Sequence, residues 1–481
     1  MKKMFALLSL ILFLSAQAQK KKPADTREAL KIQTATSIQS GYDRYKSAEL
    51  KIWNLAEVGF KEKGSTVVLQ DLLREAGFTV ETGVAGMPTA FVATFGNGSP
   101  VIGILAEFDA LPGLSQDSSV VKTTVPTLTA GHGCGHHLFG VGSVAAAISI
   151  KELLSSGKIN GTVKLFGSPA EEGGGGKVYM VRDGLFKDVD IAMHWHPGDE
   201  NGIAVSSALA YKSAKFRFHG ISAHAAGAPD KGRSALDGVE GMDNMVNMMR
   251  EHVPSTTRIH YVITSGGKAP NVVPDYAEVF YYVRHPERAQ VESIFERVEK
   301  AAEGAAMGTG TTMDYEVIDG THDLLINSTL AKDMHENLKR IGGVHYTAEE
   351  ADFARKLQSS FLGKYESPDS AAVVKPMVPE SSMGSTDVGD VSYVVPTVGM
   401  SAATWVPGTP AHSWQATACG GKDMAARGMI VAAKTLAWTA IDLYTDPALI
   451  AKAKEEFKKQ VGDYKYKALL GDRKPALNYR D

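Results

Sequence analysis

Apolar residues recur with helical spacing at the start of the chain and form short continuous runs further on. Helical spacing covers residues 45–55 and 68–73, and Gly77 ends the second of these segments. Strand-like apolar runs then alternate with helix-like segments, in the order 101–105, 138–154, 163–166, 177–182 and 191–193. Strand and helix in turn predict an α/β catalytic domain with a largely parallel sheet and helices on both faces.

The pattern changes near Lys212. Alternating residues at 215–218, 258–263 and 277–283, with helical stretches at 235–249 and 291–302, predict an inserted, smaller α+β unit. A helix at 330–341, a loop-rich stretch at 365–379, a strand at 397–400 and a long helix at 424–444 return to the first unit. We therefore expect a catalytic domain over residues 19–211 and 321–481, and an inserted domain over 212–320.

Composition and charge exclude several classes of protein. The 481 residues carry 51 Lys and Arg against 54 Asp and Glu, a net charge of −3, which leaves no basic footprint for nucleic acid. Two cysteines, Cys134 and Cys419, exclude a disulfide scaffold. Residues 1–18 have the three-part form of a signal peptide cleaved after Ala18, so we expect a secreted, periplasmic protein without a membrane span. An uncleaved interfacial anchor is the alternative.

Polar clusters follow the predicted strands, at the edge where open α/β sheets bind ligands. Acids follow the first two strands, histidines follow the third, and a Cys/His loop precedes the helix between the first and second: Glu107, Asp109, Glu171, Glu172, His194, His196, Cys134, His136 and His137. Thiolate, imidazole and carboxylate together are the ligands of a borderline-soft divalent metal. The pattern therefore indicates a metal site.

Each cluster also has a simpler interpretation. The loop 131–137 (GHGCGHH) could be a turn with incidental histidines, or Cys134 could form a disulfide with Cys419. Glu171 and Glu172 could belong to a solvated turn. The four glycines at 173–176 are not a phosphate-binding loop, because Lys177 is followed by Val178 and not by Ser or Thr.

Four motifs together resemble a known family. They are residues 107–116 (EFDALPGLSQ), 131–137 (GHGCGHH), 169–174 (PAEEGG) and 384–390 (GSTDVGD). The chain is similar over nearly its whole mature length to the co-catalytic metal-dependent amidohydrolases and carboxypeptidases, which include aminoacylases, hippurate hydrolase, auxin-conjugate hydrolases and p-aminobenzoyl-glutamate hydrolase.

The resemblance implies two divalent ions per chain, Zn or Mn, bridged by Cys134. His136 and His194, with His196 as its competitor, would complete one ion, and Glu172 and His412 the other. Glu171 would be the general base. His194 is preferred because it stands where the third strand of the family ends and because Pro197 lies three residues on. The chain departs from the family by carrying His137 where Asp is common, which leaves the orientation of His136 open.

The resemblance also identifies the inserted unit as a lid and dimerisation domain. It implies that His224, in residues 220–229 (GISAHAAGAP), reaches the active site of the partner chain and stabilises the oxyanion. Asn271 and Arg284 match positions linked to the substrate carboxylate. By themselves, His224 is a typical surface histidine, and Arg284 could equally form an ion pair at the edge of the lid's sheet.

The function implied is hydrolysis of the amide bond of N-acyl or aminobenzoyl amino acids, by metal-bound hydroxide with Glu171 as base. The working unit would be a homodimer, or a heterodimer with a related chain. Two alternatives remain open at this stage. One is an inactive periplasmic binding module of the same fold, and the other is a thiol hydrolase with Cys134 as nucleophile.

Overall fold

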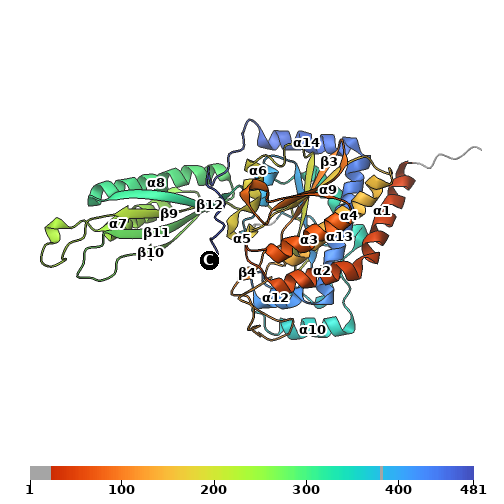
Figure 1. The fold of residues 1–481 in the computed structure, drawn as a ribbon, viewed down its shortest axis with the longest axis horizontal. Helices are drawn as coiled ribbons and strands as arrows, with labels where there is room; N and C mark the ends of the chain where they lie inside the picture. The colour runs from red at the N-terminus through yellow and green to blue at the C-terminus, as the bar shows by residue number, and fades with distance from the viewer. Residues whose placement is uncertain (1–22, 380–382) are drawn as a thin grey trace, which may run out of the picture.

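A computed structural model describes residues 23–379 and 383–481. The expected signal peptide, residues 1–18, lies outside the described residues. Figure 1 shows two units, a large α/β domain and an arm that projects from it. The chain enters the arm once and returns once, as expected for an inserted domain.

The large domain is built on a mixed sheet with the strand order β1-β2-β6-β3-β7-β13-β8. The central pairs β6–β3, β3–β7 and β7–β13 are parallel, which confirms the largely parallel α/β prediction. The strands are β1 (Thr79–Thr82), β2 (Phe91–Asn97), β3 (Val101–Ala106), β6 (Gly161–Gly167), β7 (Ile191–Gly198), β8 (Gly202–Ile203) and β13 (Thr397–Ala403). A separate short pair joins β4 (Leu111–Pro112) to β5 (Ala130–Gly131).

Helices pack around this sheet. They are α1 (Pro23–Ser40), α2 (Tyr42–Leu55), α3 (Lys63–Glu75), α4 (His136–Ser155), α5 (Glu171–Gly174), α6 (Gly176–Arg182), α9 (Ser328–Ile341), α10 (Ala348–Gln358), α11 (Val388–Ser392), α12 (Trp414–Gly420), α13 (Asp423–Thr445) and α14 (Pro447–Val461). Among the described residues, α4 is the one helix long and apolar enough to cross a membrane, and 78% of that stretch is buried inside the protein. Its apolar composition therefore matches a core helix.

The arm is an antiparallel sheet of order β10-β11-β9-β12 with two helices packed on it. Its elements are β9 (Ala210–His219), α7 (Ala235–Met249), β10 (Arg258–Ser265), β11 (Tyr276–His285), α8 (Arg288–Thr309) and β12 (Thr312–Thr321). Phe216, Phe218 and Phe295 belong to a hydrophobic core that is separate from that of the large domain. The predicted limits, 212 and 320, fall within the first and last strands of this sheet.

Several elements differ from the sequence prediction. The strand predicted to end at Met193 continues to Gly198, because Trp195 is fully buried and the alternation of His194, Trp195 and His196 is that of a strand. Strands β1, β2 and β12 and helices α1, α10 and α14 were not predicted from the sequence. Cys134 and Cys419 are both free, so the disulfide alternative is excluded.

Helix α4 packs closely against the backbone that follows β3, and Gly140 makes this approach possible. A Cβ atom at Gly140 would lie 2.8 Å from the Glu107 carbonyl oxygen and 2.9 Å from Leu69. We expect Gly140→Ala to lower the free energy of unfolding by about 1–3 kcal/mol, because the backbone after β3 would have to move. Chemical denaturation measures this change.

Gly308→Ala is the matched control. Gly308 lies in α8, and nothing lies within 4 Å of its added Cβ. There the substitution should raise stability by about 0.5–1 kcal/mol through helix propensity. Equal effects at the two positions would contradict the tight packing of α4 against Glu107.

Candidate active site

The polar clusters meet at the carboxyl ends of the parallel strands. Glu107 and Asp109 directly follow β3, while Glu171 and Glu172 follow β6 after a short loop. His196 lies near the end of β7. Because neighbouring parallel strands end at the same edge of the sheet, these side chains converge as the sequence predicted.

The loop 131–137 brings Cys134 to this edge, and its glycines allow close backbone approaches. A Cβ at Gly131 would lie 1.9 Å from the Leu114 carbonyl oxygen, and one at Gly135 would lie 2.6 Å from Pro197. The backbone N–H of His412 donates to the Gly133 carbonyl at 2.9 Å. This bond fixes the loop of His412, whose own φ is +57°, beside Cys134.

Two groups of metal-binding atoms share Cys134. The first contains Cys134, His136 and His196, and the second contains Cys134, Glu172 and His412. Within each group all ligand atoms lie within 4.8 Å of one another. The Cys134 Sγ is 3.6 Å from His196 Nε2, and His412 Nε2 is 3.1 Å from Glu172 Oε1. The arrangement offers two adjacent positions for a cation around one sulfur atom.

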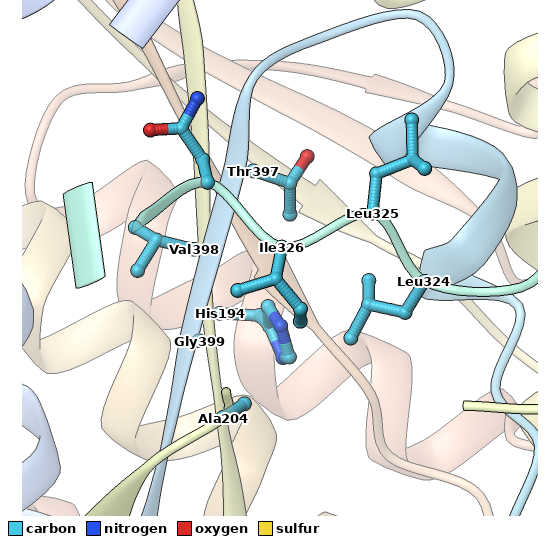
Figure 2. A pocket seen from close by; sticks show the side chains of 9 residues that line it. His194, Ala204, Leu324, Leu325, Ile326, Thr397, Val398 and Gly399 are labelled. Carbon is cyan, nitrogen blue, oxygen red and sulfur yellow. The ribbon is translucent and has the colours of Figure 1, made fainter. Parts of the chain in front are cut away.

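His194, the histidine preferred from the sequence, is not part of either group. It lies two residues before His196 on the same strand, and its ring packs over Gly399 of β13, so a Cβ there would come within 2.1 Å of His194 Nε2. Figure 2 shows His194 beside Leu324 and Ile326 in a small cavity. Burial, with the charges of His196 and Lys177, lowers the pKa of His194 to about 3. Within the described residues His196, and not His194, lies in the ligand groups, because β7 continues past His194.

Asp109 orients the imidazole of His136. Its Oδ1 is 2.8 Å from His136 Nδ1, while its Oδ2 accepts the backbone N–H of Glu172 at 3.0 Å. His136 Nε2 therefore faces the cluster, and the departure at His137 does not leave His136 without a partner. Burial raises the pKa of Asp109, but the charge and hydrogen bond of His136 outweigh this and lower it below its usual value.

His137 lies outside the ligand groups and contacts other residues. Its ring points away from the cluster, with Nε2 3.3 Å from the Gly420 carbonyl and 3.6 Å from Glu49. It also stacks near His132, with ring centroids 4.7 Å apart. Burial lowers the pKa of His137 well below its usual value, so the ring is held neutral.

Glu171 forms a third group with Glu107 and His136, again with ligand atoms within 4.8 Å of one another. Burial raises the pKa of Glu171 well above its usual range, and the charges of Glu107, Glu172 and Asp387 raise it further. A carboxyl group of raised pKa beside a cluster of ligands is suited to accepting and returning a proton near neutral pH.

Lys177 is the one ammonium buried among these acids in the part of the chain that the structure describes. Its Nζ lies 2.6 Å from Glu107 Oε1 and 2.7 Å from Asp387 Oδ1, and its side chain is fully buried. The backbone N–H of Lys177 also donates to Asp387 at 2.9 Å. Burial raises the pKa of Asp387 to about 6, although Lys177 opposes this change.

Sequence reasoning did not assign Lys177 or Asp387. The motif 384–390 contains Asp387, but its partner lies 210 residues earlier, so no local pattern connects the two. The signal present in the sequence is a lysine directly after a glycine run at a strand end, a pattern that by itself suggests only a phosphate loop.

The donor set fits a cation. Five carboxyl groups and one thiol, all buried or half-buried, gather in the cluster, and one buried ammonium group contacts two of the carboxyl groups: Glu107, Asp109, Glu171, Glu172, Asp387, Cys134 and Lys177. Among the described residues, His136 Nε2 lies 3.1 Å from Glu107 Oε2 and Glu172 Oε1 lies 3.1 Å from His412 Nε2, but neither contact has the geometry of a hydrogen bond. Unsatisfied ligand atoms and excess negative charge are costly in a buried site unless positive charge is added.

The residues assigned to the arm lie apart from this cluster. His224 is exposed; its Nδ1 accepts the backbone N–H groups of Ala226 and Gly227 at 3.2 and 3.1 Å. Asn271 is in an exposed loop, and its carbonyl accepts the N–H of Ala225. Within the chain as described, neither residue contacts the ligand groups.

Arg284 approaches the large domain. Its guanidinium stacks 5.3 Å from the ring centroids of both Tyr211 and Tyr282, and Nη1 is 3.5 Å from Ser385 Oγ. Its buried Nε has no hydrogen-bond partner, and among residues 23–379 and 383–481 no carboxylate pairs with it. The ion-pair interpretation of Arg284 therefore gains no support.

Comparison with known proteins agrees with this geometry. Residues 210–309 match the family model described as a peptidase dimerisation domain. The chain is 39% identical over 454 residues to one of the two subunits, the one designated B, of p-aminobenzoyl-glutamate hydrolase of Escherichia coli, covering 89% of this chain and 94% of that protein. It is 30% identical to the Xaa-Arg dipeptidase of Mus musculus, covering 90% and 93% of the two chains.

Solved structures share the fold. A dinuclear metal-binding peptidase of the M20 family, the YXEP protein of Bacillus subtilis, aligns with a TM-score of 0.59 at 17% identity, covering 84% of this chain and 99% of that one. An aminobenzoyl-glutamate utilization protein from Klebsiella pneumoniae aligns with a TM-score of 0.60 at 18% identity, covering 85% and 98%. The chain therefore combines an α/β domain of the peptidase type with a dimerisation domain. The chain belongs to the M20 family, whose members hydrolyse amide bonds.

The contribution of the buried Lys177 ammonium to the stability of the protein can be measured. Lys177→Met retains most of the volume but leaves the Glu107 and Asp387 carboxyl groups buried without their cation. We expect the free energy of unfolding to fall by about 3–5 kcal/mol. Denaturant titration of the metal-free protein measures this loss.

Lys164→Met is the matched control, because Lys164 pairs with Asp188, which is 60% exposed. Its removal should cost no more than about 1 kcal/mol. A similar small loss at Lys177 would mean that the ammonium does not balance the acids.

Proposed function

We propose that this protein hydrolyses the amide bond of N-acyl or aminobenzoyl amino acids, with substrates similar to p-aminobenzoyl-glutamate. The observation that carries the proposal is the pair of ligand groups that share Cys134. It occurs in a chain that is 39% identical to a component of p-aminobenzoyl-glutamate hydrolase.

Two divalent ions, Zn or Mn, would be held by the shared ligand set. Cys134 would contribute to both positions, with His136 and His196 at one and Glu172 and His412 at the other. When bound, the ions supply Lewis acidity and lower the pKa of water. His412 is suited to an accessible position, since its side chain is 53% exposed and lies at the mouth of the cluster.

The protein's own groups would handle the protons and the substrate. Glu171, with its raised pKa, would take a proton from water and return it to the departing amine. Arg284, with a planar fork and an unpaired buried Nε, would bind the substrate carboxylate together with Asn271. His224 would reach the oxyanion in the site of a partner chain, which agrees with its exposure and its distance from the ligands of its own chain.

The exposed His224 and the dimerisation-domain match support a homodimer. A heterodimer is also supported, since the relatives include both of the different chains of one Escherichia coli hydrolase. The signal-like residues 1–18 support export to the periplasm. The complete ligand set and Glu171 argue against an inactive binding module.

Replacement of the two adjacent acids should separate the base from the ligand. Glu171→Gln removes the proton acceptor and should lower kcat by roughly 10² to 10⁴ while both ions stay bound. Glu172→Gln should instead lower the metal content. Steady-state kinetics on aminobenzoyl-glutamate, with elemental analysis of each variant, measures both effects.

Glu349→Gln, at an exposed position on α10, is the control and should change neither quantity. Activity that survives complete removal of metal by a chelator would refute the metal-dependent reaction and favour Cys134 as a nucleophile. Normal turnover of the Glu171 variant would place the base elsewhere.

Complementation should show whether His224 acts between chains. His224→Ala and Glu171→Gln should each be nearly inactive alone. In a refolded mixture, heterodimers would contain one site with both defects and one with neither, so about a quarter of full activity should return if the chains pair randomly. If a refolded wild-type control recovers but the mixture does not, His224 acts within its own chain or needs a different partner.

A further inference from the structure

The last residues of the sequence return from α14 to the active site. Figure 1 shows this segment descending through the junction of the two domains to a C-terminal end near α5. We call residues 471–481 the strap. Arg182 of α6 donates to the carbonyls of Gly471 and Arg473 at 3.1 and 2.6 Å, and the Tyr179 hydroxyl donates to the carbonyl of Lys474 at 3.3 Å.

The strap also contacts the arm. Arg473 donates to the Ile318 carbonyl and, at 3.0 Å, to the carboxylate of Glu316, both on β12. The strap is therefore held by α6 on one side and by β12 on the other. These contacts fix its course before it reaches the site.

Two side chains of the strap donate hydrogen bonds to one backbone oxygen, the carbonyl of Glu172. The Tyr479 hydroxyl donates to the Glu172 carbonyl at 2.9 Å, and Arg480 Nη2 donates to the same oxygen at 2.6 Å. Arg480 stacks on the Tyr479 ring at 4.6 Å, which in turn packs edge-on against Phe60. Gly59 makes room for the hydroxyl, since a Cβ there would lie 2.0 Å from it.

The backbone of this loop is irregular and needs such support. Ala170 has φ +55° and Gly173 φ +80°, and Glu172, with ψ +73°, is not helical. The Glu172 N–H is held by Asp109, its carbonyl by the strap, and its carboxylate lies beside His412. Asp109 holds the peptide group before Glu172 and the strap holds the peptide group after it, so removing the strap contacts would release the second of these.

We propose that Tyr479 and Arg480 are positioning residues of the active site, which set the Glu172 carboxylate for a divalent cation and the adjacent Glu171 for proton transfer. This inference rests on the proposed function. Groups that orient metal ligands typically change metal affinity or activity by roughly 10- to 100-fold when they are removed. Neither residue touches the substrate or the cation in this role.

The test removes both donors and keeps the packing. The double variant Tyr479→Phe with Arg480→Met should bind one of its two Zn²⁺ ions about 10- to 100-fold more weakly, measured by competition with a chelating dye. On aminobenzoyl-glutamate at saturating Zn²⁺, kcat should fall while KM changes little. Tyr479→Phe alone should shift both quantities in the same direction by a smaller factor. Tyr479→Phe combined with Arg480→Lys keeps a donor at position 480 and should therefore lose less than the double variant with Arg480→Met.

Leu477→Ala is the matched control, because Leu477 lies in the same strap with its side chain exposed to solvent. It should match the wild type in Zn²⁺ affinity and kcat. Wild-type Zn²⁺ affinity and kcat in a folded Tyr479→Phe or double variant would overturn the inference while leaving the proposed function intact. A wild-type protein that binds no Zn²⁺ would instead refute the proposed function.

Discussion

The buried ammonium of Lys177 is the interaction on which the site depends. Glu107 follows β3 and Asp387 precedes α11, so Lys177, at the start of α6, joins three segments that are distant in sequence. Desolvating a lysine is costly, and two short ion pairs inside the protein offset that cost. Burial raises the pKa of Glu171, and the charges of the same two carboxyl groups raise it further, so the groups that Lys177 holds together also act on the candidate base.

Sequence reasoning found the parts of this arrangement that are encoded locally. Buried strands such as β3 and β6 are continuous apolar runs, and the acids that follow them are visible as motifs. His194 was preferred because the resemblance places the end of the third strand there, whereas β7 in the structure buries Trp195 and continues past His196 to Gly198. The Cys134 loop was recognised from its composition, but its glycines serve contacts with Leu114 and Pro197 that composition does not show.

The remaining contacts could not be predicted because they connect distant residues. Tyr479 lies 307 residues from Glu172, and Lys177 lies 210 residues from Asp387. Neither tyrosine nor lysine stands in a periodic pattern at these positions. A resemblance to a family identifies the candidate metal ligands through shared motifs. It does not identify the residues that hold the loops carrying those ligands. Residues of the latter kind become visible only when the hydrogen-bond partners of each backbone group are followed.

The motif 384–390 connects the site to the base of the arm. Asp387 binds Lys177, and Asp390, three residues on, accepts from the backbone of His322 at 3.0 Å and lies 2.8 Å from its Nδ1. His322 directly follows β12, and its ring is also 2.9 Å from the hydroxyl of Tyr464. Turning the arm at this point would break buried, charge-assisted hydrogen bonds, which are costly to leave unmade. The motif around the short helix α11 therefore contacts both the ammonium of the site and the segment that leaves the arm, which joins the two parts of the protein through buried contacts.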